Sequence, residues 1–289
     1  MTPSTHNLDG DLTRLLARMY DERGFDFRNY KTASLKRRVT KRLNALNIPS
    51  YNEYFNLLDS DPSEYNRLLS YITIKVSEFF REPEVFEAIG PVMKAFLPVD
   101  PAPLSAQTNA ASQMYAAESG AGLRIWCCAC ANGEEAYTLA ILSSELISHA
   151  ALKHTKIFAT DIDSEALDVA RKAEYREDFL TNVPPELVKK YFIRTGAAYK
   201  VKNSLTNIVR FGRHNIVTDR TLTKMHILFC RNLFIYFNKE LQEEVFKKLD
   251  YALSVGGILV MGKSESLPKQ FAHRYVQLGS NMSIYRKMG

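Results

Sequence analysis

Two adjacent glutamates, Glu134 and Glu135, follow a short run of small residues, and this position suggests ligand chemistry. Residues 124–128 are apolar and β-leaning, and the chain then breaks at Asn132-Gly133. Beyond the break, apolar residues recur at three- and four-residue spacing, which predicts a strand, a tight turn and a helix. Small turn residues let a ligand lie against bare backbone. The helix N–H groups could bind a carboxylate or phosphate, whereas a cationic or hydroxyl-bearing ligand would seek the glutamates. A purely structural turn is the alternative.

Further polar residues follow two later apolar runs. Asp161 comes after the predicted strand 156–160, and Arg231-Asn232 come after the predicted strand 226–230. Open α/β sheets bind ligands at the carboxyl ends of their strands, and an acid after the second strand binds ribose hydroxyls in nucleotide-binding folds. The turn before Glu134 lacks GxGxxG, which disfavours a nicotinamide-dependent enzyme. Asp163 follows closely, but it could serve only to cap the following helix, which is a structural role.

The order of predicted elements puts these residues in the second of two domains. Residues 8–97 read as helices, and residues 98–122 form a linker rich in Ala, Ser, Pro and Gly. From 123 to 289, strands and helices alternate, which predicts an α/β domain with a mainly parallel sheet and helices on both faces. Within this domain, residues 191–211 read as a hairpin.

A basic helix is predicted in the first domain. From Arg28 to Arg42 the chain holds seven basic residues and no acid. Leu35, Val39 and Leu43 mark the buried stripe of this helix. Four basic side chains are therefore expected mostly on its outer faces, namely Arg37, Arg38, Lys41 and Arg42. Solvated faces usually mix charge signs, so the run favours a binding surface over a merely solvated one.

The composition is that of an ordinary globular protein, with 46% hydrophobic and 24% charged residues. The net charge of +6 permits nucleic acid, a membrane surface or an acidic protein as partner. No apolar run approaches the roughly 20 residues that span a bilayer, and the N-terminus does not resemble a signal peptide. The spacing of the four cysteines fits neither a zinc site nor a disulfide framework. We therefore expect a cytoplasmic protein with reduced cysteines and no metal.

Five stretches occur in an order that resembles one enzyme family. They cover most of the chain from Ile72 to Leu267 and read ITIKVSEFFRE, RIWCCACANGEEAYTLAI, FATDIDSEALDVAR, ILFCRNLFIYF and GGILVMGKSESL. Together they resemble the CheR-type chemotaxis-receptor glutamate methyltransferases. The resemblance implies an all-helical N-terminal domain and a Rossmann-like methyltransferase domain with an inserted antiparallel subdomain at 191–211. It also implies S-adenosylmethionine as cofactor, S-adenosylhomocysteine as product, and receptor glutamates converted to methyl esters.

The resemblance also implies roles for individual residues. Arg81 and Tyr236 would orient the reacting groups, and no strong general base is needed because a glutamate carboxylate is already ionised at neutral pH. Glu135, with Glu134 as the second choice, would be the cofactor acid, and Asp161 would be the ribose acid. The residues expected to contact the cofactor are Lys75, Ser77, Arg81, Glu135, Asp161, Asn215, Ile216, Arg231 and Asn232.

The partner implied by the resemblance is the cytoplasmic helical domain of a chemoreceptor, whose exposed glutamates would face the basic helix. We expect a monomer that binds no nucleic acid and does not insert into a membrane. Asn132, Ala136 and Lys263 depart from the family pattern. These departures leave open a non-catalytic module that binds S-adenosylmethionine in signalling. The basic helix leaves open a methyltransferase acting on nucleic acid, and another protein substrate is a further alternative. The short predicted hairpin tip, 194–197, argues against docking of a receptor tail.

Overall fold

The computed structural model describes residues 8–73, 77–96, 122–279 and 282–289. Two compact units make up the chain. Their ranges are Met1–Ile74 with Phe234–Val245, and Lys75–Leu233 with Phe246–Gly289. The predicted linker, 98–122, lies outside the described residues except for Gly122, and Lys75 lies outside them too.

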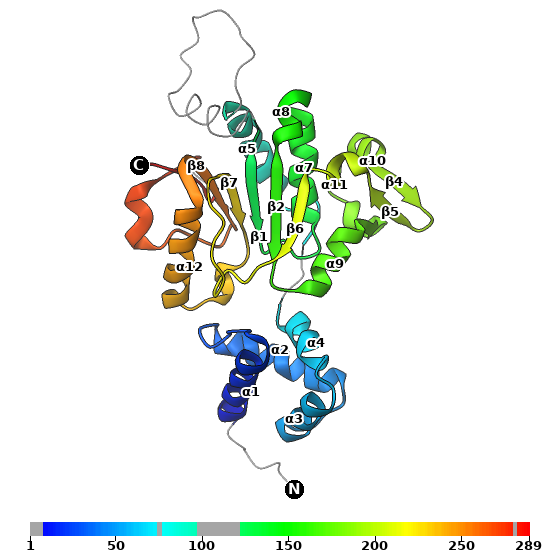
Figure 1. Cartoon of the computed structure of the whole chain (residues 1–289), viewed down its shortest axis with the longest axis vertical. Coiled ribbons are helices and arrows are strands. Elements are labelled where there is room, and N and C mark those ends of the chain that lie inside the picture. The colour runs from blue at the N-terminus through cyan, green and yellow to red at the C-terminus, as the bar shows by residue number, and fades with distance from the viewer. Residues whose placement is uncertain (1–7, 74–76, 97–121, 280–281) are drawn as a thin grey trace, which may run out of the picture. The chain divides into compact units, whose positions relative to one another are not determined.

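A seven-stranded sheet forms the centre of the larger unit (Figure 1). The strand order is β6-β2-β1-β7-β8-β10-β9; neighbours from β6 to β8 are parallel, and the last two pairings are antiparallel. The strands are β1 (Arg124–Cys128), β2 (Lys156–Asp161), β6 (Val209–Arg213), β7 (Met225–Cys230), β8 (Leu253–Met261), β9 (Tyr275–Gln277) and β10 (Ile284–Lys287). The chain runs from β1 to β2 on one side and later to β7 on the other, which makes β1/β7 the switch point where such sheets bind ligands. The predicted mainly parallel α/β fold is confirmed.

Side chains of β1 alternate between two buried faces of this sheet, as the period of a strand requires. Ile125 and Cys127 share a core with apolar residues of several helices, whereas Trp126 and Cys128 are buried outside that core. The described helices of this unit are α5 (Pro83–Ala95), α7 (Glu134–Leu146), α8 (His149–His154), α9 (Ser164–Lys172), α10 (Pro185–Tyr191) and α11 (Asn203–Thr206), with short 3₁₀ turns η1 (Glu177–Leu180) and η3 (Lys269–Arg274). Helix α12 (Lys239–Ala252) is divided between the two units.

Helix α5 packs in the larger unit, although the sequence grouped it with the N-terminal helices in 8–97. Its buried side chains, including Phe86 and Ile89, belong to the same core as Ile125 and Leu139. A helical period reveals an apolar face but not the core against which that face packs. The contacts therefore divide the chain at Ile74, before α5 begins.

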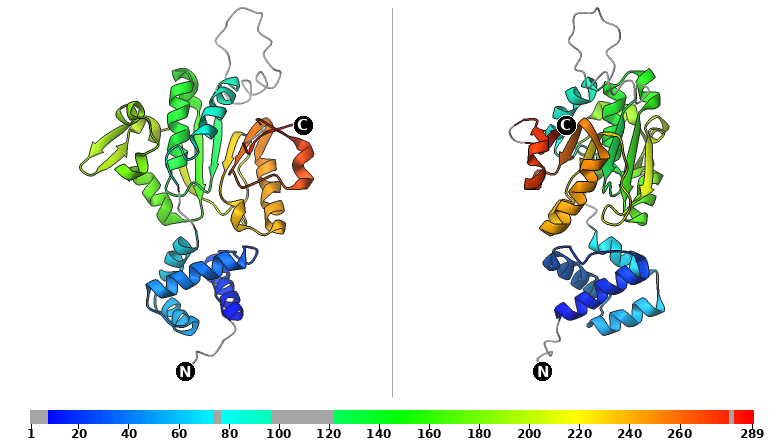
Figure 2. Two further views of the ribbon diagram at one scale, coloured as in Figure 1. Left: turned by 180° about the vertical axis from the view of Figure 1, so that it is seen from behind. Right: turned by 60° about the vertical axis from the view of Figure 1, so that its left-hand side comes forward.

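A small antiparallel sheet lies at one side of the large sheet, beside α9 and α10 (Figure 2). Its strands follow the order β3-β5-β4 and are β3 (Glu174–Arg176), β4 (Phe192–Thr195) and β5 (Ala198–Val201). Strands β4 and β5 form the hairpin predicted within 191–211, and Thr195 pairs with Ala198 across a two-residue turn. Residues 209–211 differ from that prediction, because Val209 pairs with Ile157 and belongs to β6 of the large sheet.

Among the described residues, four helices lie wholly in the N-terminal unit: α1 (Leu8–Arg23), α2 (Thr32–Ala45), α3 (Tyr51–Ser60) and α4 (Glu64–Ile72). Leu12, Leu15, Val39 and Leu68 are at most 1% exposed and lie in its core. The segment Phe234–Val245, which begins with the short 3₁₀ turn η2 (Phe234–Tyr236), packs with these helices. No helix in the described ranges is both long enough and apolar enough to cross a bilayer.

Candidate functional site

The turn between β1 and α7 combines small residues with left-handed backbone conformations. Ala129, Ala131 and Gly133 have φ angles of 58°, 48° and 95°. A Cβ on Gly133 would lie 2.8 Å from the Cβ of Ala170, so the position requires glycine for space as well as for conformation. The left-handed conformation is costly for alanine, and backbone strain of this kind concentrates at functional sites. The turn is therefore more than a simple connection.

Asp161, the last residue of β2, ties this turn to the neighbouring strand. Its Oδ2 accepts the N–H of Ala131 at 2.9 Å, and its Oδ1 accepts the N–H of Asp163 at 2.9 Å. The side chain is largely buried, and this burial raises the pKa of Asp161. Each oxygen retains acceptor capacity that two vicinal hydroxyls could use. Asp163 caps α9 by accepting from two backbone N–H groups, as the structural alternative predicted.

Glu135 is occupied by protein partners. Its Oε2 lies 2.8 Å from Nη1 of Arg231, and its Oε1 accepts the thiol of Cys127 at 3.2 Å. Arg231 directly follows β7 and also pairs with Glu82, at 2.7 Å. Burial by itself lowers the pKa of Arg231, but Glu135 and Glu82 outweigh this effect and raise it. These three residues form a charged cluster at the ends of β1 and β7.

Glu134 differs from Glu135, because it is a buried carboxylate that no described arginine or lysine pairs with. It is fully buried in the first turn of α7. Neither of its oxygens meets a hydrogen-bond partner of normal geometry among the residues that the structure describes. Burial raises the pKa of Glu134 to about 7, and the nearby Ser77 and Asn132 offset only part of this rise. An unpaired buried acid is costly and is a sign of a missing ligand or a redox or catalytic role.

The segment from Ser77 to Glu82 lies beside this cluster. The backbone N–H of Phe80 donates to Oγ1 of Thr138 in α7 at 3.0 Å, and the carbonyl of Arg81 accepts Nη2 of Arg231 at 3.1 Å. Ser77 and Arg81 are both half-buried. The structure therefore brings Ser77 and Arg81 to the same end of the sheet as Glu134 and Glu135.

The loop after β6 also reaches this end of the sheet. The N–H of His214 donates to the carbonyl of Asp161 at 2.9 Å. The next residue, Asn215, uses its side-chain oxygen to accept the N–H of Val217 at 3.0 Å, and Ile216 is buried. Asn215 and Ile216 thus lie beside Asp161, on the opposite side of it from β1.

Glu265 is a site residue that the sequence did not single out. Its Oε2 accepts the N–H of Asn232 at 2.9 Å and that of Gly262 at 2.8 Å. Asn232 follows β7 with a left-handed φ of 59°, and Glu265 stabilises its backbone there. Asn232 is half-buried at the same strand end as Arg231. Glu265 is the acid of the KSES stretch that resembles the family. Only the fold shows that its carboxylate accepts the N–H of Asn232.

Tyr236 belongs to the N-terminal unit, whereas Arg81 belongs to the larger unit. The ring of Tyr236 is half-buried, and the guanidinium carbon of Arg38 lies 5.9 Å from its centroid. The N–H of Lys31 donates to the carbonyl of Tyr236 at 2.9 Å. Arg38 also donates to the carbonyl of Tyr71 at 3.3 Å, and burial lowers its pKa. Two residues of the basic segment therefore contact Tyr236.

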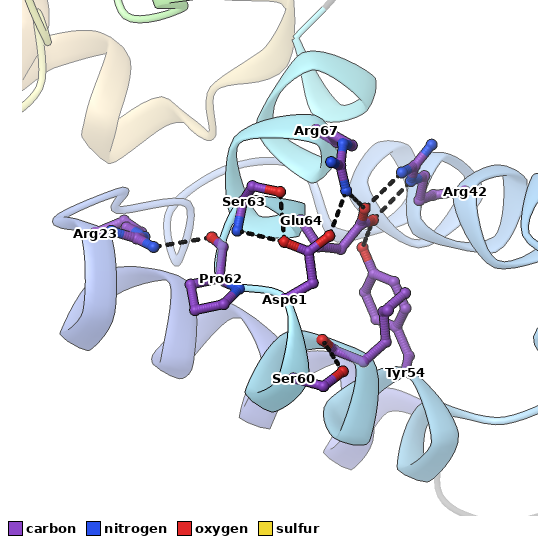
Figure 3. Close-up of polar contacts among 10 residues, drawn as sticks. Arg23, Arg42, Tyr54, Ser60, Asp61, Pro62, Ser63, Glu64 and Arg67 are labelled. Atoms are coloured by element: carbon purple, nitrogen blue, oxygen red, sulfur yellow. Dashed lines mark hydrogen bonds and ion pairs between the residues drawn. The ribbon is translucent and has the colours of Figure 1, made fainter.

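The expectation that Arg42 lies on an outer face is wrong. Arg42 is only 9% exposed, and its guanidinium donates to both oxygens of Glu64, at 2.7 and 2.6 Å. Figure 3 shows Arg42, Tyr54 and Arg67 converging on that carboxylate. Position 42 follows Val39 by three residues, so it shares the buried side of α2 with the apolar stripe. Arg37 and Lys41 are exposed, as expected.

The four cysteines are free thiols and all are buried. Burial raises the pKa of Cys127 and Cys130 well above the usual range, so these thiols are not reactive nucleophiles. Across the described ranges, no three His, Cys, Asp or Glu side chains group as ligands for a metal ion.

A separate pocket of about 560 Å³ opens in the region of the small antiparallel sheet. Its lining includes Phe192 of β4, Tyr199 of β5 and Val188 of α10, with Lys189 and Arg194 as basic groups. None of the residues at the ends of β1, β2 and β7 belongs to this lining.

Two family models match the chain and together span most of it. Residues 75–283 match the model described as "CheR methyltransferase, SAM binding domain". Residues 10–73 match the model described as "CheR methyltransferase, all-alpha domain". The first match alone covers more than half of the chain.

Curated relatives agree with these matches. An uncharacterized 104.1 kDa protein of Rhodobacter capsulatus is 33% identical over 84% of the chain, which spans only 24% of that protein. A protein of Pseudomonas putida named Cher3 is 30% identical over 98% of the chain and 99% of its own length. The chemotaxis protein methyltransferase of Escherichia coli is 28% identical over 89% of the chain and 85% of its own length.

Proposed function

The chain belongs to the CheR methyltransferase family, and we propose that it converts glutamate side chains of a chemoreceptor's cytoplasmic helical domain into methyl esters. Its larger unit is the S-adenosylmethionine-binding domain of that family. The observation that carries the proposal is the grouping of Asp161, Glu134 and Arg81 at one end of the sheet, beside the β1/β7 switch point.

The residues at this end fit S-adenosylmethionine. The unpaired buried carboxylate of Glu134 suits the donor's positive charge, and Asp161 has acceptor capacity left for ribose hydroxyls. Glu135 was the preferred cofactor acid from sequence, but its charge is already paired with Arg231. We therefore assign the cationic end of the donor to Glu134, and the adenine end to Asn215 and Ile216. Ser77 and Asn232 complete the proposed binding set, and Lys75 stays a prediction.

The chemistry requires placement more than proton transfer. S-adenosylmethionine, when bound, supplies an electrophilic methyl group on a sulfonium. A receptor glutamate is already ionised at neutral pH, so the chain needs no general base. It must align the carboxylate and exclude water from it. We assign this orientation to Arg81, whose guanidinium can form charge-assisted hydrogen bonds to a carboxylate, and to Tyr236, whose hydroxyl can donate a hydrogen bond.

The basic face of α2 supports an acidic helical partner. Arg37 and Lys41 are exposed, and the run from Arg28 to Arg42 contains no acid to repel a glutamate-bearing helix. Contacts of this kind chiefly raise the association rate and fix the register of the partner, and they weaken with salt. Arg42 is left out of this surface because it pairs with Glu64.

The departures from the family pattern do not remove any of these groups. Ala136 is fully buried in α7, and Lys263 is exposed. Neither side chain is among the partners of Asp161, Glu134 or Arg231. A non-catalytic signalling module therefore has no specific support from these two positions.

Transfer of a labelled methyl group tests the function directly. The chain is incubated with labelled S-adenosylmethionine and, in parallel, with a chemoreceptor cytoplasmic domain or with nucleic acid. Label on the receptor domain that alkali releases as methanol supports a carboxyl methyl ester. Label on nucleic acid, or donor binding without transfer to either, would replace the proposed function by one of its alternatives.

A further inference from the structure

One buried guanidinium joins the segment that carries Arg81 to the end of β7. Nη2 of Arg231 lies 2.7 Å from Oε2 of Glu82 and 3.1 Å from the carbonyl oxygen of Arg81. Nη1 of the same side chain lies 2.8 Å from Oε2 of Glu135. Arg231 therefore fixes two elements at once, the segment before α5 and the first turn of α7.

The conformation of Glu82 shows that its carboxylate is held by this contact. Glu82 precedes Pro83 at the start of α5, with φ 61° and ψ 72°, and its side chain makes no cap bond to the helix. A left-handed residue other than glycine costs about 1–3 kcal/mol. Helix capping therefore does not explain a glutamate at this position, whereas the ion pair with Arg231 does.

We propose that Glu82 and Arg231 are positioning residues for methyl transfer, which act by fixing the backbone of Arg81 against Glu135. This inference rests on the proposed function, in which Arg81 orients the receptor carboxylate. The side chain of Arg231 is only 2% exposed, and Nη1 and Nη2 already have protein acceptors. Arg231 thus has little surface left for a ligand, although the sequence assigned it to the cofactor.

Small displacements of an orienting group slow catalysis strongly, since a shift of about 1 Å can lower the rate roughly a hundredfold. The Arg81 backbone is bracketed by the N–H of Phe80 bonded to Thr138 and by its own carbonyl bonded to Arg231. Loss of the Glu82 contact would leave the Arg81 carbonyl as the one described bond from this segment to Arg231, which would keep Glu135 as counter-ion. The segment would then lose one of its anchors while α7 kept its own.

The substitution Glu82→Gln tests this inference with little risk to folding. Glutamine keeps the shape and an acceptor oxygen but removes the charge, and Arg231 keeps Glu135 as counter-ion. Removing Arg231 instead would leave two carboxylates unpaired, a change that is itself strongly destabilising. The matched control is Glu78→Gln, because Glu78 lies in the same segment, is exposed, and bonds Asn182 rather than Arg231.

The first readout needs neither donor nor receptor. Hydrogen exchange of the backbone amides from 78 to 82 is measured by mass spectrometry in the full chain. We expect these amides to exchange at least about threefold faster in Glu82→Gln, because local opening becomes easier, and to be unchanged in Glu78→Gln. Unchanged exchange in Glu82→Gln would overturn the inference, whatever the chain methylates.

The second readout is a double-mutant cycle on receptor methylation. We expect Glu82→Gln to lower kcat about tenfold, with the KM for the receptor changed less than about threefold. In an Arg81→Ala background, the same substitution should change kcat less than about twofold, because its effect passes through Arg81. Equal effects in both backgrounds would show that Glu82 does not act through Arg81. A wild-type chain that methylates no receptor would contradict the proposed function, and hydrogen exchange alone would then decide whether Glu82 fixes the segment.

Discussion

Arg42 and Glu64 form a two-point ion pair between helices α2 and α4, at 2.7 and 2.6 Å. Glu64 is 1% exposed and also accepts the hydroxyl of Tyr54 at 2.7 Å. Although burial alone would raise it, the pKa of Glu64 is lowered by Arg42 and Tyr54. The most buried basic residue of the helix thus supports the fold and is not available for a partner.

We expect Arg42→Ala to lower the free energy of unfolding of the N-terminal unit by up to about 3–5 kcal/mol, because the buried Glu64 carboxylate loses its two-point partner and keeps only the Tyr54 hydroxyl and the longer 3.4 Å contact with Arg67. Arg37→Ala, on the exposed face of the same helix, should stay within about 0.5 kcal/mol of the unsubstituted chain. Urea-induced unfolding followed by circular dichroism measures both. Similar small changes in the two variants would mean that the ion pair contributes little.

Asp161→Ala should weaken S-adenosylmethionine binding by about 1–3 kcal/mol, since the acid supports both the β1 turn and the proposed ribose contact. Calorimetry with the donor and with S-adenosylhomocysteine measures this loss. The control is Asp163→Ala, which removes the cap of α9 and should cost about 1 kcal/mol of stability without a comparable loss of donor affinity. Equal donor affinities for Asp161→Ala and the unsubstituted chain would remove Asp161 from the site.

Because burial raises the pKa of Glu134, we expect the stability of the chain to fall as the pH rises. Burial raises its pKa from 4.5 to about 7 in the folded chain, so between these values the folded chain retains a proton that the unfolded chain releases. The stability from this group is complete below pH 4.5 and is lost as the pH rises through 7. Glu134→Gln should flatten this decline and stabilise the donor-free chain at pH 8 by up to about 3 kcal/mol.

The same substitution should weaken donor binding about tenfold or more, because a positive group on the donor loses its counter-ion. Thermal unfolding across pH and calorimetry measure the two effects. Glu165→Gln, an exposed first-turn glutamate of α9, serves as control. A variant that binds the donor as tightly as the unsubstituted chain would exclude Glu134 from the cationic end of the site.

The double substitution Arg37→Glu with Lys41→Glu should leave donor affinity intact and reduce receptor methylation about tenfold, equivalent to roughly 1.4 kcal/mol. It should also make turnover less sensitive to salt, since exposed charges are screened. The pair avoids Arg42, whose loss would act through stability. If neither turnover nor its salt dependence moved, α2 would be only a solvated face, and the small-sheet region around β4 and β5 would be the next surface to test.

Much of the site could be predicted from sequence because strand ends in parallel sheets converge. The position of Asp161 after an apolar run was enough to expect it beside the β1 turn, and the structure joins it to Ala131. The fold class followed from the same alternation of strands and helices. Family resemblance added Arg81 and Tyr236, whose roles remain predictions.

The partners of charged residues could not be predicted in the same way. Periodicity placed Arg42 on an outer face of its helix, whereas tertiary packing buries it against Glu64. Sequence alone could not show which of Glu134 and Glu135 is left for the cofactor. That depends on Arg231, which is distant in sequence and forms an ion pair with Glu135. Glu82 and Glu265 could not be identified from sequence, because their contacts with Arg231 and Asn232 join residues that are far apart along the chain.

Mapping of methyl groups on a receptor tests the central claim most directly. A chemoreceptor cytoplasmic domain is incubated with the chain and S-adenosylmethionine, and its peptides are analysed by tandem mass spectrometry before and after mild alkali. The account predicts methyl groups on glutamate side chains, lost entirely in alkali and strongly reduced in number when Arg81→Ala replaces the unsubstituted chain. Methyl groups on nitrogen that survive alkali, or a receptor left unmodified by a chain that binds the donor, would contradict it.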